Sequence, residues 1–374
     1  MRILQRGICL LVLLVGAAVA PASAADPTGA PMSGDLPPLA DMPFYRSDPN
    51  RSAIQPGPGP AAAPELAWQQ PLSTDSHFLP ILVDGAVIGG TNDGLVVAVD
   101  AHTGAERWRF TAAGPVGGSA GAANGLVYFG DTHSLFALDV KTGTQRWVAE
   151  VPSAETRPLV VDGVVYTAAI GGVLGFDAST GKQVWHWAGP QVPVAVGSIA
   201  DGVLYSMAGD GRVYAIDIRT STEKWHVQTI GPNPGYPEVV GDTVYAATVQ
   251  GEAQEPIGEL YAIDRETGIV RWRFRSPTGQ QISAGPVKNG ILYANSEFDG
   301  IYALRDDGGS ASVIWHVDAP RGYWPTAMVG DTLYQQRRDG SVGAYALGDG
   351  ALEWETSPLD VAAGGPVISG GMVF

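Results

Sequence analysis

Cysteine and positive charge are scarce in this 374-residue sequence. The one cysteine, Cys9, lies near the start, and a disulfide within the chain needs two. Lys and Arg number 22 against 38 Asp and Glu, which gives a net charge of −16. Such a charge disfavours binding to nucleic acid and to anionic membrane surfaces. No apolar run is long enough to span a bilayer, so we expect no transmembrane segment.

The first 24 residues have the pattern of an export signal. Arg2 and Arg6 precede the apolar run from Ile8 to Ala20, and Ala22-Ser23-Ala24 supplies a small-x-small cleavage site. Cys9 lies before most of this run rather than beside the cleavage point, so we expect no lipid anchor. The pattern therefore predicts an exported protein, either periplasmic or extracellular.

Two further regions follow the predicted signal peptide. Residues 25–63 are rich in Pro, Gly, Ala and Asp, a composition that predicts a flexible linker with little local structure. Residues 64–374 contain 44 of the 50 glycines, many of them in predicted short turns, with no helical periodicity in between. We therefore assign the region from residue 64 onward to one domain.

A phrase of nine residues, Asp-x-x-Thr-Gly-x-x-x-Trp, recurs in that domain at a spacing of roughly forty residues, which is typical of a repeat architecture. Five copies keep the frame from Asp to Trp, with Thr220-Ser221 replacing Thr-Gly in one of them. They are Asp100 to Trp108, Asp139 to Trp147, Asp177 to Trp185, Asp217 to Trp225 and Asp264 to Trp272. Trp315 and Trp354 continue the series, and Trp68 precedes it. We interpret these tryptophans as structural.

Each repeat reads as four short strands. An Asp-Gly or Asn-Gly pair such as Asn124-Gly125 predicts a two-residue hairpin, and the Asp of the phrase caps a second turn. A small residue precedes that Asp, which suggests that the repeated Trp packs against it. The small residues are Ala98, Ala137, Gly175, Ala215, Ala262, Ala303 and Ala346. Four strands per repeat predict an all-β fold, a β-propeller of four-stranded blades.

The two ends of the domain predict how the ring closes. Residues 364–374 align with the opening of a repeat, and residues 64–68 resemble an outermost strand. We expect an eight-bladed plan in which these two parts share the last blade. That blade is expected to be incomplete in this chain, with the Trp68 strand unpaired and the natural reading frame continuing beyond Phe374.

The repeats resemble those of the quinoprotein-type β-propellers, which carry pyrroloquinoline quinone-like repeats of the form Ala-x-Asp-x-x-Thr-Gly-x-x-x-Trp. That family includes dehydrogenases that bind the quinone, and exported propellers without cofactor, such as the scaffold lipoprotein of the outer-membrane barrel-assembly machinery. In the dehydrogenases the quinone lies between a Trp and a disulfide of adjacent cysteines, and Ca²⁺ is held by carboxylate and amide oxygens. This sequence cannot form that disulfide, and none of its Asp or Glu residues matches the calcium or catalytic positions.

The resemblance leaves three functions open. We expect a non-catalytic binding or scaffold module in the cell envelope or outside the cell, with no cofactor and with a protein or polymer partner. The alternative is a dehydrogenase of alcohols or sugars that depends on pyrroloquinoline quinone and Ca²⁺. A sugar-chain lyase or hydrolase would need paired acids, and only Glu155 and Glu238 are available at the expected channel rim.

That rim is the place where the repeats differ, at the start of the innermost strand. In propellers of this kind the corresponding loops surround one mouth of the central channel, and binding residues tend to lie on such loops. The charged and aromatic residues at these positions are our candidate ligand-binding set. They are His77, Phe78, Glu155, Arg157, Tyr236, Glu238, Arg321, Tyr323 and Trp324.

No metal site is expected. His186, His226 and His316 each follow a repeat Trp, so they occupy one outward position in different blades and cannot converge on a metal. A longer hairpin contains Glu252, Glu255 and Glu259, which predicts either a solvated insertion or, less simply, a loop that attracts a cation.

Overall fold

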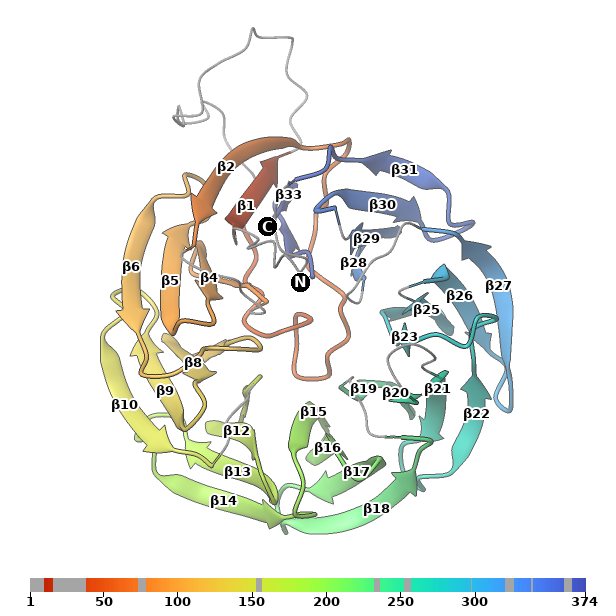
Figure 1. Cartoon of the computed structure of the whole chain (residues 1–374), viewed down its shortest axis with the longest axis horizontal. Coiled ribbons are helices and arrows are strands. Elements are labelled where there is room, and N and C mark those ends of the chain that lie inside the picture. Colours follow the sequence, from red (N-terminus) through yellow and green to blue (C-terminus); the bar gives the residue numbers. More distant parts are fainter. Residues whose placement is uncertain are drawn as a thin grey trace, which may run out of the picture.

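The computed structural model describes residues 10–15, 38–72, 79–152, 157–231, 236–251, 257–296, 298–319, 326–337, 339–359 and 365–374. These residues form eight antiparallel sheets arranged as blades around a central channel, and no helix (Figure 1). The predicted eight-bladed β-propeller is confirmed.

The blades are numbered here along the chain, and each is given from its innermost to its outermost strand. Blade 1 contains β3 (Ile81–Val83), β4 (Ala86–Gly90), β5 (Leu95–Asp100) and β6 (Glu106–Thr111). Blade 2 contains β7 (Gly121–Ala123), β8 (Leu126–Gly130), β9 (Ser134–Asp139) and β10 (Gln145–Glu150). Blade 3 contains β11 (Leu159–Val161), β12 (Val164–Ala169), β13 (Gly172–Asp177) and β14 (Gln183–Ala188). Blade 4 contains β15 (Val194–Ala200), β16 (Val203–Ala208), β17 (Arg212–Asp217) and β18 (Thr222–Gln228).

The second half of the ring follows the same order. Blade 5 contains β19 (Glu238–Val240), β20 (Thr243–Gln250), β21 (Ile257–Asp264) and β22 (Val270–Phe274). Blade 6 contains β23 (Ile282–Ser283), β24 (Val287–Lys288), β25 (Ile291–Ser296), β26 (Gly300–Asp306) and β27 (Ala311–Val317). Blade 7 contains β28 (Ala327–Val329), β29 (Thr332–Gln336), β30 (Val342–Ala346) and β31 (Leu352–Glu355). Blade 8 contains β32 (Ile368–Ser369), β33 (Met372–Val373), β1 (Leu10–Val15) and β2 (Glu65–Pro71).

In blades 1 and 2 the two turns of the repeat have the chemistry that the sequence predicts. Asn124 and Gly125 both have positive φ, 51° and 75°, as a two-residue hairpin with a mirror-image turn requires. In the second turn, Oδ1 of Asp100 accepts hydrogen bonds from the backbone N–H groups of His102 and Thr103, at 3.1 and 2.9 Å. This cap fixes the direction in which the outermost strand leaves the turn, and so the position of the Trp that follows.

The repeated Trp joins each blade to the next. Trp108 of blade 1 donates its indole N–H to the carbonyl of Val140 in blade 2, the neighbouring blade, at 2.7 Å. A Cβ atom added to Gly143 would lie 2.7 Å from the Trp108 ring, so glycine is needed there for the ring to approach. We call this arrangement the Trp latch. It recurs at Trp68 with Ala101 and Gly104, Trp147 with Ala178 and Gly181, Trp225 with Arg265 and Gly268, and Trp315 with Leu347 and Gly350.

The predicted small residue lies opposite the Trp within its own blade. Ala98 is the register partner of Trp108, and the other blades repeat this pairing. In blade 7 the prediction was wrong by two residues, because Ala344 rather than Ala346 pairs with Trp354. Ala346 instead takes the place of the turn Asp. The contact with the next blade's glycine was not foreseen from the sequence.

Two of the repeated tryptophans do not form the latch, and both face an altered turn. Among the described residues, the indole N–H groups of Trp185 and Trp272 are buried without a partner. The next blade after Trp185 has Ser221 in place of the turn glycine, at a φ of 58°. The next blade after Trp272 has the longer turn around Gly308. The variation in turn sequence therefore has a structural consequence at the blade boundary.

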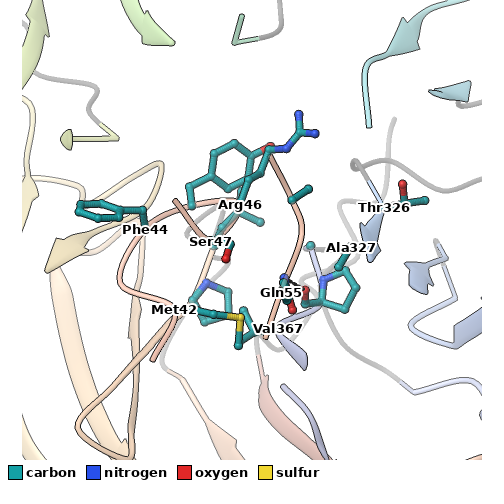
Figure 2. Close-up of a pocket in the computed structure, with 14 residues that line it drawn as sticks. Met42, Phe44, Arg46, Ser47, Gln55, Thr326, Ala327 and Val367 are labelled. Carbon is teal, nitrogen blue, oxygen red and sulfur yellow. Dashed lines mark hydrogen bonds between the residues drawn. The ribbon is translucent and has the colours of Figure 1, made fainter. Parts of the chain in front are cut away.

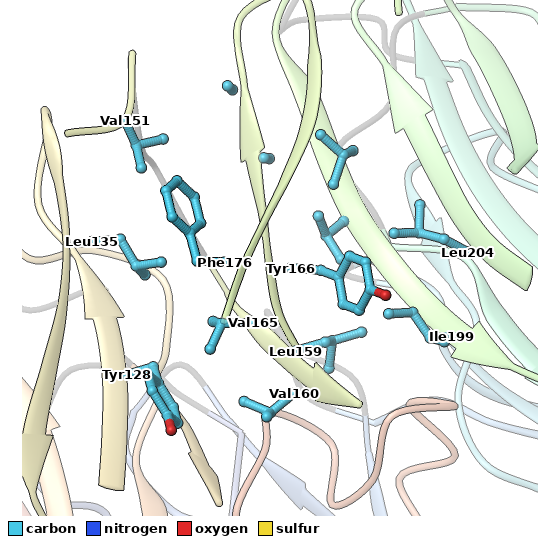
Figure 3. Packing of buried hydrophobic residues seen from close by; sticks show 14 of the residues in the cluster. Tyr128, Leu135, Val151, Leu159, Val160, Val165, Tyr166, Phe176, Ile199 and Leu204 are labelled. Atoms are coloured by element: carbon cyan, nitrogen blue, oxygen red, sulfur yellow. The ribbon is translucent and has the colours of Figure 1, made fainter. Parts of the chain in front are cut away.

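The hydrophobic core lies between neighbouring blades. Figure 3 shows one cluster in which Leu135 of blade 2, Tyr166 of blade 3 and Leu204 of blade 4 belong to one continuous layer. Trp147 lies in the same cluster at 8% exposure. Each blade thus buries its two faces against its neighbours, as a ring of sheets requires.

Blade 8 corrects the prediction about ring closure. The Trp68 strand, β2, is the outermost strand of this blade, as predicted, but it is not unpaired: β1 pairs with it from Leu10↔Pro71 to Val15↔Glu65. β1 also pairs with β33, so the described residues close the ring (Figure 1). The prediction failed because the sequence assigned Leu10–Val15 only to an export signal, whereas an apolar run of this length can also form an interior strand that pairs with the edges of β2 and β33.

Residues 38–60, which we call the strap, correct a second prediction. This segment was expected to be part of a flexible linker, yet it crosses the centre of the ring in contact with the innermost strands (Figure 1). Six equivalent backbone N–H groups, each two residues before an inner hairpin turn, donate hydrogen bonds of 2.6–3.1 Å to it. The pairs are Leu82 to Met42, Ala122 to Pro43, Ile199 to Pro49, Val239 to Asn50, Met328 to Ala53, and Ile368 to the Gln55 side chain.

The Trp latch gives a matched test. The substitution Trp108→Phe removes an indole N–H that is bonded to Val140, whereas Trp272→Phe removes one that has no partner. Both side chains are buried, at 7% and 4% exposure. We expect Trp108→Phe to lower the free energy of unfolding by about 1–2 kcal/mol more than Trp272→Phe, as measured by urea denaturation. Equal losses in the two variants would contradict the latch.

Candidate functional site

The candidate site is a cluster of charged and aromatic residues where the strap meets blades 3, 4 and 5. Its centre is Arg51, which is 1% exposed. The Arg51 guanidinium donates to the carbonyls of Arg157 at 3.0 Å, Val196 at 3.2 Å and Tyr45 at 3.3 Å, and its Nε donates to Gly197. Burial lowers the pKa of Arg51 to about 9. Arg51 thus fixes the strap to two blades through backbone oxygens.

A second guanidinium contacts two tyrosine rings. Cζ of Arg157 is 4.3 Å from the ring centroid of Tyr45 in the strap and 4.3 Å from that of Tyr236 before β19. The two rings are 6.0 Å apart and meet edge to face. Cation–π contacts of this kind are worth more where water is excluded. These contacts join blade 3, blade 5 and the strap.

A buried ion pair completes the cluster. The Arg46 guanidinium of the strap contacts the Glu238 carboxylate, whose side chain is 0% exposed, and also donates to the Ala284 carbonyl at 3.3 Å. Burial raises the pKa of Glu238 to about 8, and Asp48 nearby adds to this, although Arg46 opposes the shift. Because burial outweighs the attraction, the carboxyl group titrates near neutral pH.

The strap holds several residues in a backbone conformation that side chains disfavour. Arg46, Ser47, Arg51 and Ala53 have φ values of 61°, 81°, 58° and 55°. Each such residue costs on the order of 1 kcal/mol and persists only where the surroundings determine the backbone. The contacts of Arg46 and Arg51 supply that constraint.

A small pocket lies on the other side of the strap, between it and blades 1, 7 and 8. Figure 2 shows Met42, Ser47, Gln55 and Val367 around it, while the Arg46 side chain extends away from them. The Gln55 amide is already used, since it donates to the Pro366 carbonyl at 3.1 Å and accepts from the Ile368 N–H at 2.6 Å. The pocket lining is mainly apolar, with no pair of carboxylates.

The structure brings together three residues of the sequence-predicted rim set: Arg157, Tyr236 and Glu238. β11 and β19 are three residues long, so each spans only about 10 Å. The strap lies near the hairpin end of these strands, and over so short a distance it also reaches the side chains at the start of each strand. The other members lie outside the described residues. They are His77, Phe78, Glu155, Arg321, Tyr323 and Trp324.

The strap residues of the cluster were missed. Tyr45, Arg46 and Arg51 belong to the segment whose Pro and Gly content predicted a linker. The signal that could have found them is the apolar and aromatic group Met42-Pro43-Phe44-Tyr45, which a solvated linker has no reason to contain. Met42, Phe44 and Tyr45 are all buried.

The remaining candidates lie elsewhere. His186, His226 and His316 are on β14, β18 and β27 of three different blades, as the sequence predicted. Glu259 is not part of a solvated loop: it lies within β21 at 6% exposure and pairs with Arg275 at 2.8 Å. Glu252 and Glu255 lie outside the described residues.

The described part of the chain has neither a cluster of metal ligands nor a membrane-spanning helix. No three His, Cys, Asp or Glu side chains in it are grouped so that they could hold a metal ion. It contains no helix with the length and apolar character needed to cross a membrane.

The Glu238 carboxyl group predicts a pH dependence of stability. Its folded-state pKa of about 8 lies above the ordinary 4.5, so the stability present below pH 4.5 is lost as the pH rises toward 8. We expect Glu238→Gln to flatten the fall in melting temperature between pH 5 and pH 8. Glu266→Gln, at an exposed carboxylate paired with Lys224, is the control and should leave that fall unchanged. A Glu238→Gln profile parallel to the wild type would contradict the assignment.

Comparison with known proteins places the chain in a family. The family model described as outer membrane protein assembly factor BamB matches residues 92–255 and 256–358. BamB of Nitrosomonas eutropha is 26% identical over 181 residues, which is 46% of this chain and 44% of that protein. The dehydrogenase subunit of the quinone alcohol dehydrogenase of Gluconacetobacter polyoxogenes is 33% identical over 226 residues, which is 52% of this chain and 30% of that protein.

The chain thus matches less than half the length of each of these two relatives. The crystal structure of BamB from Moraxella catarrhalis superposes with a TM-score of 0.63 at 20% identity, covering 75% of this chain and 85% of that one. At this identity the superposition shows the fold alone. Because the family model covers well over half of the chain, the protein belongs to the BamB-like family of β-propellers with pyrroloquinoline quinone-like repeats.

Proposed function

We propose that this protein is an exported, non-catalytic β-propeller that serves as a binding or scaffold module in the cell envelope or outside the cell. The proposal rests on one observation: the strap, a segment of the chain itself, lies in the central channel. Glu238, the one rim carboxylate of the predicted set that the structure describes, is 0% exposed and faces Arg46 of the strap. A general base has to reach its substrate, and this carboxylate is covered.

The similarity to BamB also supports a binding or scaffold role. A family model and a curated relative both carry the name of an outer membrane protein assembly factor, and such a role needs a binding surface rather than a reaction. We infer that the partner is an envelope or extracellular protein, with a polymer ligand as the other candidate. The leader pattern of residues 1–24 supports export to the periplasm or beyond.

The second candidate is a quinone-dependent dehydrogenase, which the similarity to an alcohol dehydrogenase subunit favours. The residues present do not fit the quinone site that the resemblance implies. That site uses a disulfide between adjacent cysteines, and this sequence has one cysteine. We therefore propose no bound cofactor and derive no step through one.

Two measurements on the exported protein test the proposal. After incubation with pyrroloquinoline quinone and Ca²⁺, we expect no reduction of an artificial electron acceptor with alcohols or sugars above a heat-denatured control. In cells treated with a cross-linker, we expect one defined envelope or extracellular partner to be recovered with the propeller. Quinone-dependent turnover, or recovery of the propeller without any partner, would contradict the proposal.

A further inference from the structure

The Trp latch is missing at two of the boundaries between blades. At the boundary of blades 3 and 4, the indole N–H of Trp185 is buried without a partner among the residues that the structure describes, and Ser221 replaces the turn glycine of blade 4. At the boundary of blades 5 and 6, the indole N–H of Trp272 is in the same state, and a Cβ atom added to Gly308 of the blade 6 turn would meet nothing within 4 Å. These two boundaries therefore lack the contact that joins the outermost strand of one blade to the next blade.

Blades 4 and 5 lie between these two boundaries and are latched to each other (Figure 1). The Trp225 indole N–H donates to the Arg265 carbonyl at 3.0 Å, and a Cβ atom added to Gly268 would lie 2.9 Å from the Trp225 ring. Residues 194–274, from β15 to β22, thus form a pair of blades with a latch between them. In the described part of the chain, no latch joins this pair to blade 3 or to blade 6.

The strap has two cationic residues, Arg46 and Arg51, and Arg51 lies at the first of these boundaries. Its guanidinium donates to the carbonyl of Arg157, just before β11 of blade 3, at 3.0 Å. It also donates to the carbonyls of Val196, at 3.2 Å, and Gly197, both in β15 of blade 4. One buried side chain therefore joins the innermost strands of blades 3 and 4.

Arg46 has the same relation to the second boundary. Its guanidinium contacts the Glu238 carboxylate in β19 of blade 5 and donates to the Ala284 carbonyl of blade 6, between β23 and β24, at 3.3 Å. Arg46 and Arg51 both have a φ near 60°, a conformation that persists only where contacts determine the backbone. Both cationic residues of the strap thus join innermost strands at boundaries where the outermost strands are not joined.

We propose that the strap is a clasp for the ring: its two guanidinium groups close, from the channel side, the two blade boundaries that have no Trp latch. Without these contacts, blades 4 and 5 open away from the ring as one unit. Such an opening is a local event, because every blade keeps its own ladder of hydrogen bonds while the boundary separates. The proposal rests on the contacts of the strap and does not depend on the proposed function.

Three buried alanines report on three boundaries. Ala208 of β16 packs in the cluster that includes blade 3, and Ala247 of β20 packs in the cluster that includes blade 6. Ala246, adjacent to Ala247 in the same strand, packs in the cluster that includes blade 4. Their exposures are 3%, 5% and 0%, in that order. Each alanine is replaced singly by cysteine in the full chain with Cys9→Ser, and the rate at which a thiol reagent labels the introduced cysteine measures how often that boundary opens.

The labelling rates test the two contacts separately. We expect Arg51→Met to speed labelling at position 208 at least about tenfold and Arg46→Met to do the same at position 247, while labelling at position 246 changes less than about twofold in both variants. With both arginines replaced, positions 208 and 247 should both be labelled fast while position 246, between blades 4 and 5, stays protected.

Ser221→Gly tests the clasp with both arginines in place. Glycine adopts the φ of 58° at position 221 without strain and lets the Trp185 ring approach, so labelling at position 208 should slow at least about threefold. In this background Arg51→Met should have a smaller effect at position 208, and labelling at position 247 should stay unchanged. Equal acceleration at all three positions by the arginine variants, no acceleration at position 208 or 247, or no slowing by Ser221→Gly would overturn the proposal.

Discussion

The structure depends on how the innermost strands of the propeller satisfy their backbone groups. Each innermost strand pairs on one side only, so its other edge faces the central channel with N–H and C=O groups that need partners. A propeller with an open channel leaves those groups to water. Here the chain supplies the partner itself, because the strap accepts hydrogen bonds from equivalent N–H groups in six of the eight blades.

This arrangement decides what the described part of the channel offers to other molecules. The strap covers Glu238 with Arg46 and places Tyr45 against Arg157, so two of the side chains that the sequence indicated as a binding rim hold the strap in place. The same contacts stabilise four residues with positive φ. The strap therefore occupies the part of the channel beside blades 3, 4 and 5.

The sequence predicted those features that recur with a fixed spacing. The capped turn at Asp100, the hairpin at Asn124-Gly125 and the small residue opposite Trp108 appear in several copies, and repetition separates them from chance. Only one contact of the repeated Trp was predicted, the one with the small residue of its own blade. Its other partner, Gly143, lies in the next repeat, and a contact between two repeats produces no recurring spacing within a single repeat.

The strap and the third strand of blade 8 could not be predicted in this way, because both act mainly through backbone groups. Pro43, Pro49 and Asn50 bind through carbonyl oxygens, which every residue has, so their side chains carry no sign of the role. Leu10–Val15 pairs by register with β2 while its composition is that of an export signal. From composition alone, the strap was predicted to be part of a flexible linker and Leu10–Val15 part of an export signal, and neither prediction includes a fixed place in the folded domain.

Amide hydrogen exchange of the intact protein tests the central claim most directly. The N–H groups of Leu82, Ala122, Ile199, Val239, Met328 and Ile368 lie on inner edges and are bonded only to the strap in that direction. If the strap is part of the fold, these six amides exchange at least about a hundred times more slowly than unprotected amides and as one group. Fast exchange of all six, at the rate of free strand edges, would contradict the account.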